Sequence, residues 1–387
     1  MPPAQSDTSD SSGEGTDEEA QRNELLNAAE FGNVPALERC LTLGFSPNLR
    51  DEAGRTALWL GCWEGHLQAV QCLVEAGATA ELSDHEETTP FSVACENGRV
   101  DIVRYLAKAS GLWRGLRAAG RAPPGALVDP ERPDTDRCTP FFRACLLGRI
   151  EVVTFLAEEL HVDVVCVDKD GNSPFLVACQ EGHMDVIRYL AGPPCSVDVE
   201  RPSTGGWTPF SCACFQGCIE VVRYLGGIGV DMERTDDRGF SPFHAACQEG
   251  HLPVAKYLAD GLGSKLNPDL GNNLGATAFF LACGKGHLPV VRFLATLLGA
   301  DVTKARNNGR TPFYVACRYG NLEVVRYCAK ELRVDIDQRL GHREAPVTPL
   351  HVACARGQVE VVQFLLDRGV KVAHSAEDGI TPLLQAT

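Results

Sequence analysis

One ten-residue pattern recurs along the chain and constrains its fold more than any other feature. A Ser or Thr opens each copy, and the first nine copies carry Cys six residues later and Gly nine residues later. The opening residues are Thr56, Thr89, Thr139, Ser173, Thr208, Ser241, Thr277, Thr311, Thr348 and Thr381, with successive spacings of 33, 50, 34, 35, 33, 36, 34, 37 and 33 residues. A period of this length predicts an array of stacked repeats, in which chain length counts repeats instead of globular domains.

Each copy has the pattern of two short helices joined by a tight turn. Thr89 followed by Pro90 is typical of a helix N-cap and first turn, and Gly98 is typical of a helix end. Residues 100–106 then place apolar side chains at helical spacing, and residues 168–172 form a turn rich in Asp, Asn and Gly. Because one such pair cannot bury its apolar face alone, neighbouring pairs are expected to stack on a continuous core.

The repeat resembles the ankyrin repeat, whose Thr-Pro-Leu-His-x-Ala signature residues 348–353 match in full. Residues 241–246 come close, and Gly-His recurs between the two helices, as in Gly65-His66. Phe often replaces the Leu of the signature, and Cys replaces the small residue of the first helix. The resemblance implies an all-α fold, an ankyrin-type α-solenoid of stacked helix–turn–helix repeats with β-turn or hairpin-like connections.

The repeat positions also predict the domain boundaries. Residues 1–20 hold six acidic residues and no basic one, so we expect a disordered acidic tail. Residues 21–387 form the array of about ten repeats, with an N-terminal cap lacking the Thr-Pro start. The spacing of 50 marks an insertion near residues 110–137, and residues 381–387 begin an eleventh repeat that is expected to be truncated.

Charge and cysteine content narrow the classes of partner. The formal net charge is −15, which gives no general attraction to nucleic acid, and no apolar run is long enough for membrane insertion. The N-terminal segment has no apolar core typical of a signal peptide, and a secreted disulfide scaffold would be shorter than this chain with its 17 cysteines. We therefore expect a cytoplasmic monomer, with the nucleus as an alternative location.

The repeated cysteines are expected to serve packing. They are Cys62, Cys95, Cys145, Cys179, Cys214, Cys247, Cys283, Cys317 and Cys354. Equivalent positions of adjacent repeats should lie ~8–10 Å apart, too far for a disulfide, and buried free Cys acts as a small hydrophobe. Cys212, Cys214 and Cys218 form a tight cluster, for which packing is favoured over zinc binding. No cofactor is expected.

No catalytic group stands out. Most of the ten histidines fall on repeat positions, where hydrogen bonding within or between repeats explains them. The acidic residues are spread along helix faces and turns, and a repeat array lacks the deep pocket of most enzymes. The chain is therefore predicted not to be an enzyme.

A protein partner is expected to bind the surface that varies while the framework repeats. In the ankyrin family this is the concave groove of turn tips and first-helix ends, which here means the residues seven and eight after each Ser or Thr. The predicted binding residues are Trp63, Glu64, Glu96, Leu146, Leu147, Gln180, Phe215, Gln248, Lys285, Arg318, Tyr319 and Arg356, together with Trp113 in the insertion.

These groove positions differ in character along the chain. Several are large and apolar, which suggests binding anchors, although some of these side chains could instead fold back on the neighbouring repeat. Acidic members occur in the first seven repeats and basic members in the last three, so a partner with one basic and one acidic end would bind in one orientation.

The predicted function is a non-enzymatic scaffold or adaptor, and the alternative is a regulatory array within a longer enzyme or channel.

Overall fold

The computed structural model describes residues 14–111, 128–338 and 348–371, and it builds them mainly from paired helices. The first five pairs are α1 (Glu14–Glu30) and α2 (Val34–Thr42), α3 (Ala57–Glu64) and α4 (Leu67–Glu75), α5 (Pro90–Glu96) and α6 (Val100–Ala109), α7 (Pro140–Leu146) and α8 (Ile150–Phe155), and α9 (Pro174–Glu181) and α10 (Met184–Ala191). The next five are α11 (Pro209–Gln216) and α12 (Ile219–Gly227), α13 (Pro242–Gln248) and α14 (Leu252–Leu262), α15 (Ala278–Lys285) and α16 (Leu288–Thr296), α17 (Pro312–Tyr319) and α18 (Leu322–Lys330), and α19 (Pro349–Ala355) and α20 (Val359–Asp367). A π-helical turn (Leu156–Leu160) extends α8, and a 3-10 turn (Gly263–Lys265) follows α14.

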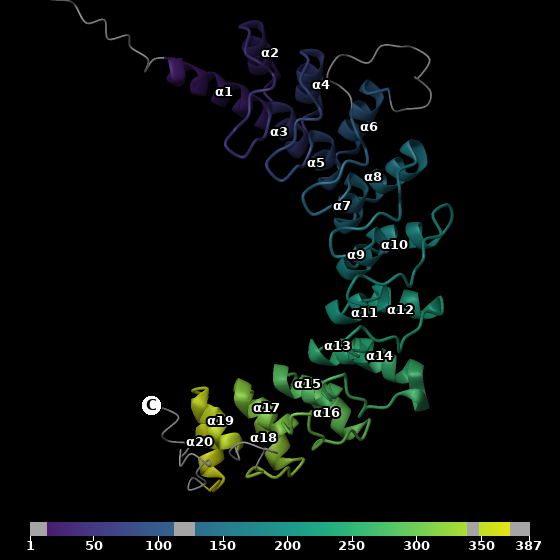
Figure 1. The fold of residues 1–387 in the computed structure, drawn as a ribbon, viewed down its shortest axis with the longest axis vertical. Coiled ribbons are helices and arrows are strands. Elements are labelled where there is room, and N and C mark those ends of the chain that lie inside the picture. The colour runs from purple at the N-terminus through teal and green to yellow at the C-terminus, as the bar shows by residue number, and fades with distance from the viewer. Residues whose placement is uncertain (1–13, 112–127, 339–347, 372–387) are drawn as a thin grey trace, which may run out of the picture. The chain divides into compact units, whose positions relative to one another are not determined.

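The helices form two compact units, each with two layers. Unit 1 comprises residues 1–178 and 185–197, and unit 2 comprises residues 179–184 and 198–387. In unit 1 the first helices α1, α3, α5 and α7 pack in sequence, and the second helices α2, α4, α6 and α8 form the other layer (Figure 1). In unit 2 the first helices α11 to α19 and the second helices α12 to α20 repeat this arrangement. The resemblance to an all-α ankyrin solenoid is thus confirmed at the level of the fold.

The repeated Ser or Thr begins each first helix, as the sequence predicts. Thr89 has extended backbone angles (φ −82°, ψ 161°), and its hydroxyl accepts a hydrogen bond from the Ser92 amide at 3.1 Å. Equivalent bonds of 3.1–3.4 Å form at all nine caps from Thr56 to Thr348. Each satisfies one of the amides that a helix start leaves without a partner, a contribution of about 1 kcal/mol.

Glycine ends the first helices because the chain there adopts a left-handed conformation. Gly65 has φ +92°, and a Cβ atom at this position would lie only 2.7 Å from the Arg99 side chain. Only glycine combines that backbone angle with so close a neighbour. The glycine of each repeat is therefore explained by helix termination.

The core lies between the two layers of each unit. The Phe and Cys of the repeat are buried together, with Phe91 and Cys95 both fully inaccessible to solvent. Aliphatic residues of the second helices, such as Ile102 and Leu106, complete this core. All 17 cysteines are free thiols. Eight of the nine repeated cysteines are buried, as expected of packing residues, whereas Cys354 is half-buried.

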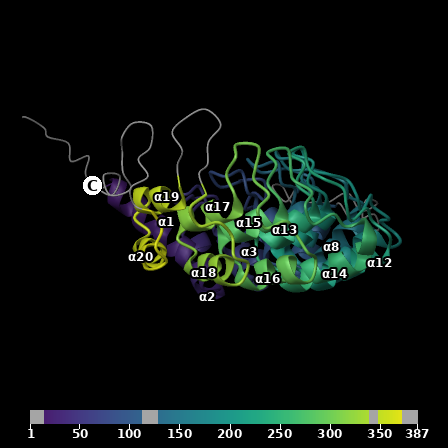
Figure 2. The same ribbon diagram turned by 90° about the horizontal axis from the view of Figure 1, so that it is seen from below.

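The turns between repeats are joined by backbone hydrogen bonds at their tips. The amide of His85 donates to the carbonyl of Ala53, and the amide of Thr135 donates to that of Glu86. In unit 2, the amide of Asn307 donates to Leu274 in the same way. Strand pairing in the described ranges is limited to two isolated bridges. The turns before α15 and α17 project away from the helices (Figure 2).

A second set of contacts joins neighbouring repeats at the turn between the helices. The donor is the side chain ten residues after the opening Ser or Thr of a repeat. The acceptor is a main-chain carbonyl of the preceding repeat, seven residues after the opening residue of that repeat. The bonded pairs are Arg99 with Trp63, Arg149 with Glu96, Cys218 with Gln180, His251 with Phe215, and Asn321 with Gly284. Histidines therefore take part in hydrogen bonding between repeats, as expected.

The N-terminal helix begins earlier than the sequence indicates. The predicted boundary between residues 20 and 21 falls inside α1, which starts at Glu14. Glu, Gln, Arg and Ala dominate this segment and are strong helix formers, and the buried Leu25 and Ala29 anchor the helix against its neighbours. Residues 14–20 are therefore helical and do not belong to the expected tail.

Some predicted features lie outside the described residues. They are residues 1–13 of the expected tail, Trp113 with residues 112–127 of the insertion, and the expected eleventh repeat at residues 381–387. None of the helices within the described ranges is long and apolar enough to cross a membrane.

Candidate protein-binding surface

The predicted groove residues differ in how much of each side chain is available to a partner. Trp63, Glu64, Leu147, Lys285, Tyr319 and Arg356 are exposed, whereas Glu96, Leu146, Gln180, Phe215, Gln248 and Arg318 are half-buried. Five of these residues border two hollows, one in each unit. The hollows are therefore the places where the predicted residues contribute to a shaped surface.

The first, which we call the acidic hollow, lies in unit 1 and has a volume of about 340 Å³. It is bordered by Ala53, Trp59, Trp63, Asp84, His85, Glu86, Thr88, Glu96 and Arg143. The first helices α3, α5 and α7 and the turns before α3 and α5 supply these residues, so the hollow lies where the family groove is expected.

Two tryptophans form the apolar wall of the acidic hollow. The rings of Trp59 and Trp63 stack with centroids 5.3 Å apart and an interplanar angle of 11°. Trp59 is buried, and its indole N–H donates to the Thr88 carbonyl at 3.1 Å, which fixes the ring. Trp63 lies one helical turn later and is 40% exposed, so it presents an oriented aromatic surface to solvent.

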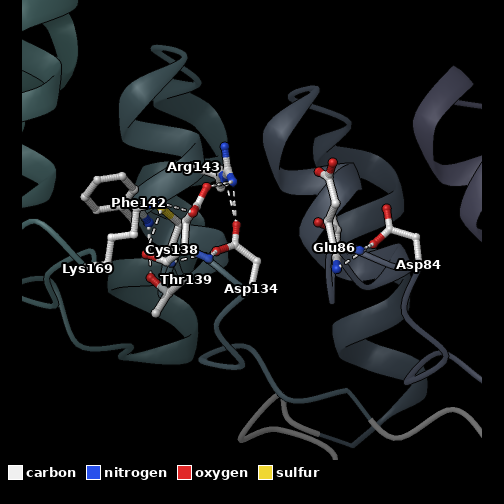
Figure 3. A network of polar contacts seen from close by, with 10 residues as sticks. Asp84, Glu86, Asp134, Cys138, Thr139, Phe142, Arg143 and Lys169 are labelled. Carbon is white, nitrogen blue, oxygen red and sulfur yellow. Dashed lines mark hydrogen bonds and ion pairs between the residues drawn. The ribbon is translucent and has the colours of Figure 1, made fainter. Parts of the chain in front are cut away.

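The basic side chain at this hollow already has its counter-ion. Arg143 donates to one Asp134 oxygen from Nε at 2.9 Å and from Nη2 at 2.6 Å (Figure 3). The other Asp134 oxygen accepts the amides of Asp136 and Cys138, both at 2.9 Å. The positive charge of Arg143 is thus largely neutralised by Asp134, which is not part of the hollow lining.

The carboxylates facing the acidic hollow have no such partner. Among the described residues, no basic side chain forms an ion pair with Asp84, Glu86 or Glu96. Burial raises the pKa of Glu96, Arg143 opposes this, and the nearby carboxylates of Asp134, Asp84 and Glu86 raise the pKa further. The hollow therefore combines an aromatic wall with excess negative charge.

The second, the basic hollow, lies in unit 2 and has a volume of about 450 Å³. It is bordered by Gln248, Phe280, Leu281, Gly284, Lys285, Arg306, Val315 and Tyr319. Arg306 lies over the Phe280 ring at 5.5 Å, and Tyr319 is 59% exposed. Lys285 forms a 3.3 Å ion pair with Glu249. Because Glu249 offsets part of the Lys285 charge, Arg306, for which the described residues form no ion pair, supplies most of the positive charge beside the aromatic surface of this hollow.

Some predicted residues border neither hollow. Phe215 packs edge-on against Trp207, with ring centroids 5.5 Å apart and an interplanar angle of 87°. Trp207 directly precedes Thr208 and belongs to the same repeat as Phe215, so this contact lies within one repeat. Glu64, Leu146, Leu147, Gln180, Arg318 and Arg356 likewise border neither hollow.

Sequence reasoning missed several residues of the two hollows. Arg143 occupies a repeat position that holds Val in Val93, Val177 and Val315. Comparing each repeat position across the array would have singled it out. Phe31, 76% exposed, occupies the equivalent groove position of the first repeat, which lacks the Thr-Pro start and so escaped the count.

Family comparison agrees with this architecture. The model for "Ankyrin repeats (3 copies)" matches residues 25–112, 125–203, 141–236, 194–269, 228–305 and 261–339, and the single "Ankyrin repeat" model matches residues 347–376. The chain belongs to the ankyrin repeat family. Members of this family generally mediate protein–protein interactions and are generally non-catalytic.

Similarity to curated ankyrin repeat proteins covers short stretches. "Ankyrin repeat and KH domain-containing protein mask-1" of Caenorhabditis elegans is 33% identical over 86 residues, which are 22% of this chain and 3% of that protein. "Putative ankyrin repeat protein YahD" of Escherichia coli K12 is 33% identical over 86 residues, 22% of this chain and 43% of that protein. Human "Ankyrin repeat domain-containing protein 63" is 41% identical over 69 residues, 18% of each chain. The matched stretches thus span less than half of these relatives.

Proposed function

We propose that this ankyrin repeat protein is a non-enzymatic scaffold or adaptor that binds a protein partner through the first-helix ends and turn tips. The observation that carries the proposal is the pair of hollows, whose linings include residues that differ from those at the same position of other repeats. A framework position needs the same residue in every repeat, so an isolated change facing a hollow has a reason other than folding.

The two hollows favour a partner with both basic and acidic segments. Trp63 and Glu96 would contact the basic segment, whereas Lys285 and Tyr319 would contact the acidic one. Aromatic and arginine residues dominate binding hot spots, so Trp63 and Tyr319 are the proposed anchors. The remaining predicted groove residues, including Leu147 and Arg356, would complete the contact surface.

Peptide selection tests the proposal. Random peptides displayed on phage are selected against the full chain, and the binders are measured against Trp63→Ala and Tyr319→Ala. Loss of a hot-spot side chain should weaken binding roughly tenfold or more for binders that use its hollow. Leu43→Ala and Leu297→Ala serve as controls, because both side chains are highly exposed but border neither hollow.

The controls decide the outcome. Binders that lose affinity with Trp63→Ala or Tyr319→Ala but stay within about twofold for both controls would support the proposal. Binders that respond equally to all four substitutions, or to none, would contradict it. We further propose a cytoplasmic or nuclear location for this interaction.

A second candidate is a regulatory array that belongs to a longer multidomain protein. The short matched share of the Caenorhabditis elegans relative, 3% of its length, favours this candidate. Sequencing full-length transcripts tests it, because a reading frame that continues into a catalytic or membrane domain would support it and an immediate stop codon would refute it.

A further inference from the structure

We propose that the acidic hollow binds the guanidinium group of an arginine side chain from the partner protein. The inference rests on the proposed function, because it names the group that one of the two hollows recognises. Three features carry it: the exposed Trp63 ring, the carboxylates without an ion pair, and the compensation of the Arg143 charge by Asp134.

The aromatic surface suits a flat cation. The Trp63 ring is oriented by stacking on Trp59, and its main-chain carbonyl accepts bonds from Arg99 Nε and Nη2 at 3.3 and 3.2 Å. A guanidinium is planar and lies readily on an indole face. The same molecule already pairs these groups next to the hollow, where the Arg55 guanidinium lies 5.6 Å from the Trp59 ring centre.

The carboxylates supply matching hydrogen-bond acceptors. One oxygen of Asp84 accepts the amides of Glu86 and Thr88 at 3.0 and 2.8 Å, which orients this carboxylate at the turn. Glu96 is half-buried and unpaired, so it gains when a cation arrives. A guanidinium has five donors in a fixed fork, more than an ammonium can direct at separate carboxylates and an aromatic face together.

The charge of Arg143 does not cancel this preference. Its Nη2 lies 2.6 Å from Asp134, so a carboxylate outside the hollow lining compensates it, whereas Asp136, 3.9 Å away, is paired with Lys169 at 2.7 Å. The lining of the hollow then retains the charges of Asp84, Glu86 and Glu96. An arriving arginine meets net negative charge in a partly enclosed space, where charge pairs are stronger than in bulk water.

The pKa of Glu96 determines the direction in which arginine affinity changes with pH. Burial holds that pKa above its ordinary value in the free protein, and a bound guanidinium stabilises the ionised form. Arginine affinity should therefore increase as the pH rises through the pKa of free Glu96. Glu96→Gln should remove most of that increase.

The test titrates the full chain with five pentapeptides, acetyl-Gly-Gly-Xaa-Gly-Gly-amide, in which Xaa is arginine, lysine, trimethyllysine, citrulline or norleucine. Binding is followed by NMR through the indole N–H signals of Trp59 and Trp63. The arginine peptide should bind about fivefold or more tightly than the citrulline peptide, which has a similar shape but no charge. Lysine should lie between them.

A matched pair of substitutions locates the site. Glu96→Gln should weaken arginine binding about fivefold, whereas Glu64→Gln, the same change next to Trp63 but outside the hollow lining, should alter it less than twofold. Trp63→Ala should also weaken it, as judged by the Trp59 signal. Equal binding of citrulline and arginine, tighter binding of lysine or trimethyllysine, or equal effects of Glu96→Gln and Glu64→Gln would overturn the inference.

Failure of this inference and failure of the proposed function have different signatures. Phage-selected binders that depend on Trp63 or Tyr319, combined with no arginine preference in the titration, would overturn the inference alone. Binders that ignore both hollows would contradict the proposed function, whatever the pentapeptides do.

Discussion

Removing the Asp134 carboxylate should destabilise unit 1 more than removing the equivalent carboxylate of the next repeat. Asp134 and Asp168 both accept two backbone amides of their own turn, at 2.8–2.9 Å. Each also accepts from one side chain: Asp134 holds the largely buried Arg143 at 2.6 Å, whereas Asp168 accepts the Asn172 side-chain amide at 2.8 Å. The comparison of Asp134→Ala with Asp168→Ala therefore measures how much more the ion pair contributes than that amide bond.

The structure sets the expected magnitude. Two turn hydrogen bonds of about 1 kcal/mol each, with the more exposed bond from the Asn172 side chain, give ~2–3 kcal/mol for Asp168→Ala. Breaking a fully buried ion pair by removing one partner costs about 3–5 kcal/mol. The Arg143 side chain is still 24% exposed and keeps Asp136 at 3.9 Å, so this cost is reduced to about 1–2 kcal/mol. Asp134→Ala should then cost ~3–4 kcal/mol in total.

A double-mutant cycle removes the other side of the pair. Arg143→Val installs the residue found at this position in Val177, and by itself it should cost about 1–3 kcal/mol, because the Asp134 carboxylate, only 2% exposed, then keeps its two backbone amides but no counter-ion. In the Asp134→Ala background it should restore about 1–2 kcal/mol, because no unpaired cation remains.

Urea unfolding followed by circular dichroism measures these free energies, since urea, unlike guanidinium, does not screen charge. Equal losses for Asp134→Ala and Asp168→Ala, or no rescue by Arg143→Val, would refute the reasoning.

Three further outcomes are expected. Burial lowers the pKa of His244, so the unfolded state binds more protons and the stability of unit 2 should fall as the pH drops below about 6.5. His244→Ser, which copies Ser211 of the preceding repeat, should make the urea midpoints at pH 5 and pH 8 more alike. Burial raises the pKa of repeated thiols such as Cys95, so at pH 8 these cysteines should react with a disulfide reagent only after unfolding; rapid native labelling, located by mass spectrometry, would contradict their packing role. Arg318→Glu with Arg356→Glu should slow association of acidic display-selected peptides at low salt, and unchanged stopped-flow on-rates would count against charge steering.

Most of the fold could be predicted because its causes lie within about ten residues of one another. The Ser or Thr cap, the following Pro, the buried Cys and the left-handed Gly each act within a single helix, as at Thr89, Cys95 and Gly98. The start of α1 at Glu14 escaped this reasoning, because a polar segment looked disordered although its residues favour a helix that is anchored further along.

The hollows were harder to predict because they depend on contacts between repeats. Trp63 and Glu96 come from groove positions that the sequence did indicate, but Trp59 was hidden among core residues although it lies one helical turn from Trp63. The neutralisation of Arg143 by Asp134 requires a turn to fold back on the following helix, which no spacing rule expresses.

The contact between the side chain of one repeat and the main-chain carbonyl of the preceding repeat has a consequence for modularity. His66, Arg99, Cys218 and Asn321 share little chemically, yet each reaches the corresponding carbonyl of its neighbour. Because every residue type carries the acceptor, each junction constrains only the donor side and ignores the identity of the residue that receives the bond. Internal repeats should thus tolerate duplication or exchange at these junctions, and binding specificity can change at the groove positions without rebuilding the joints.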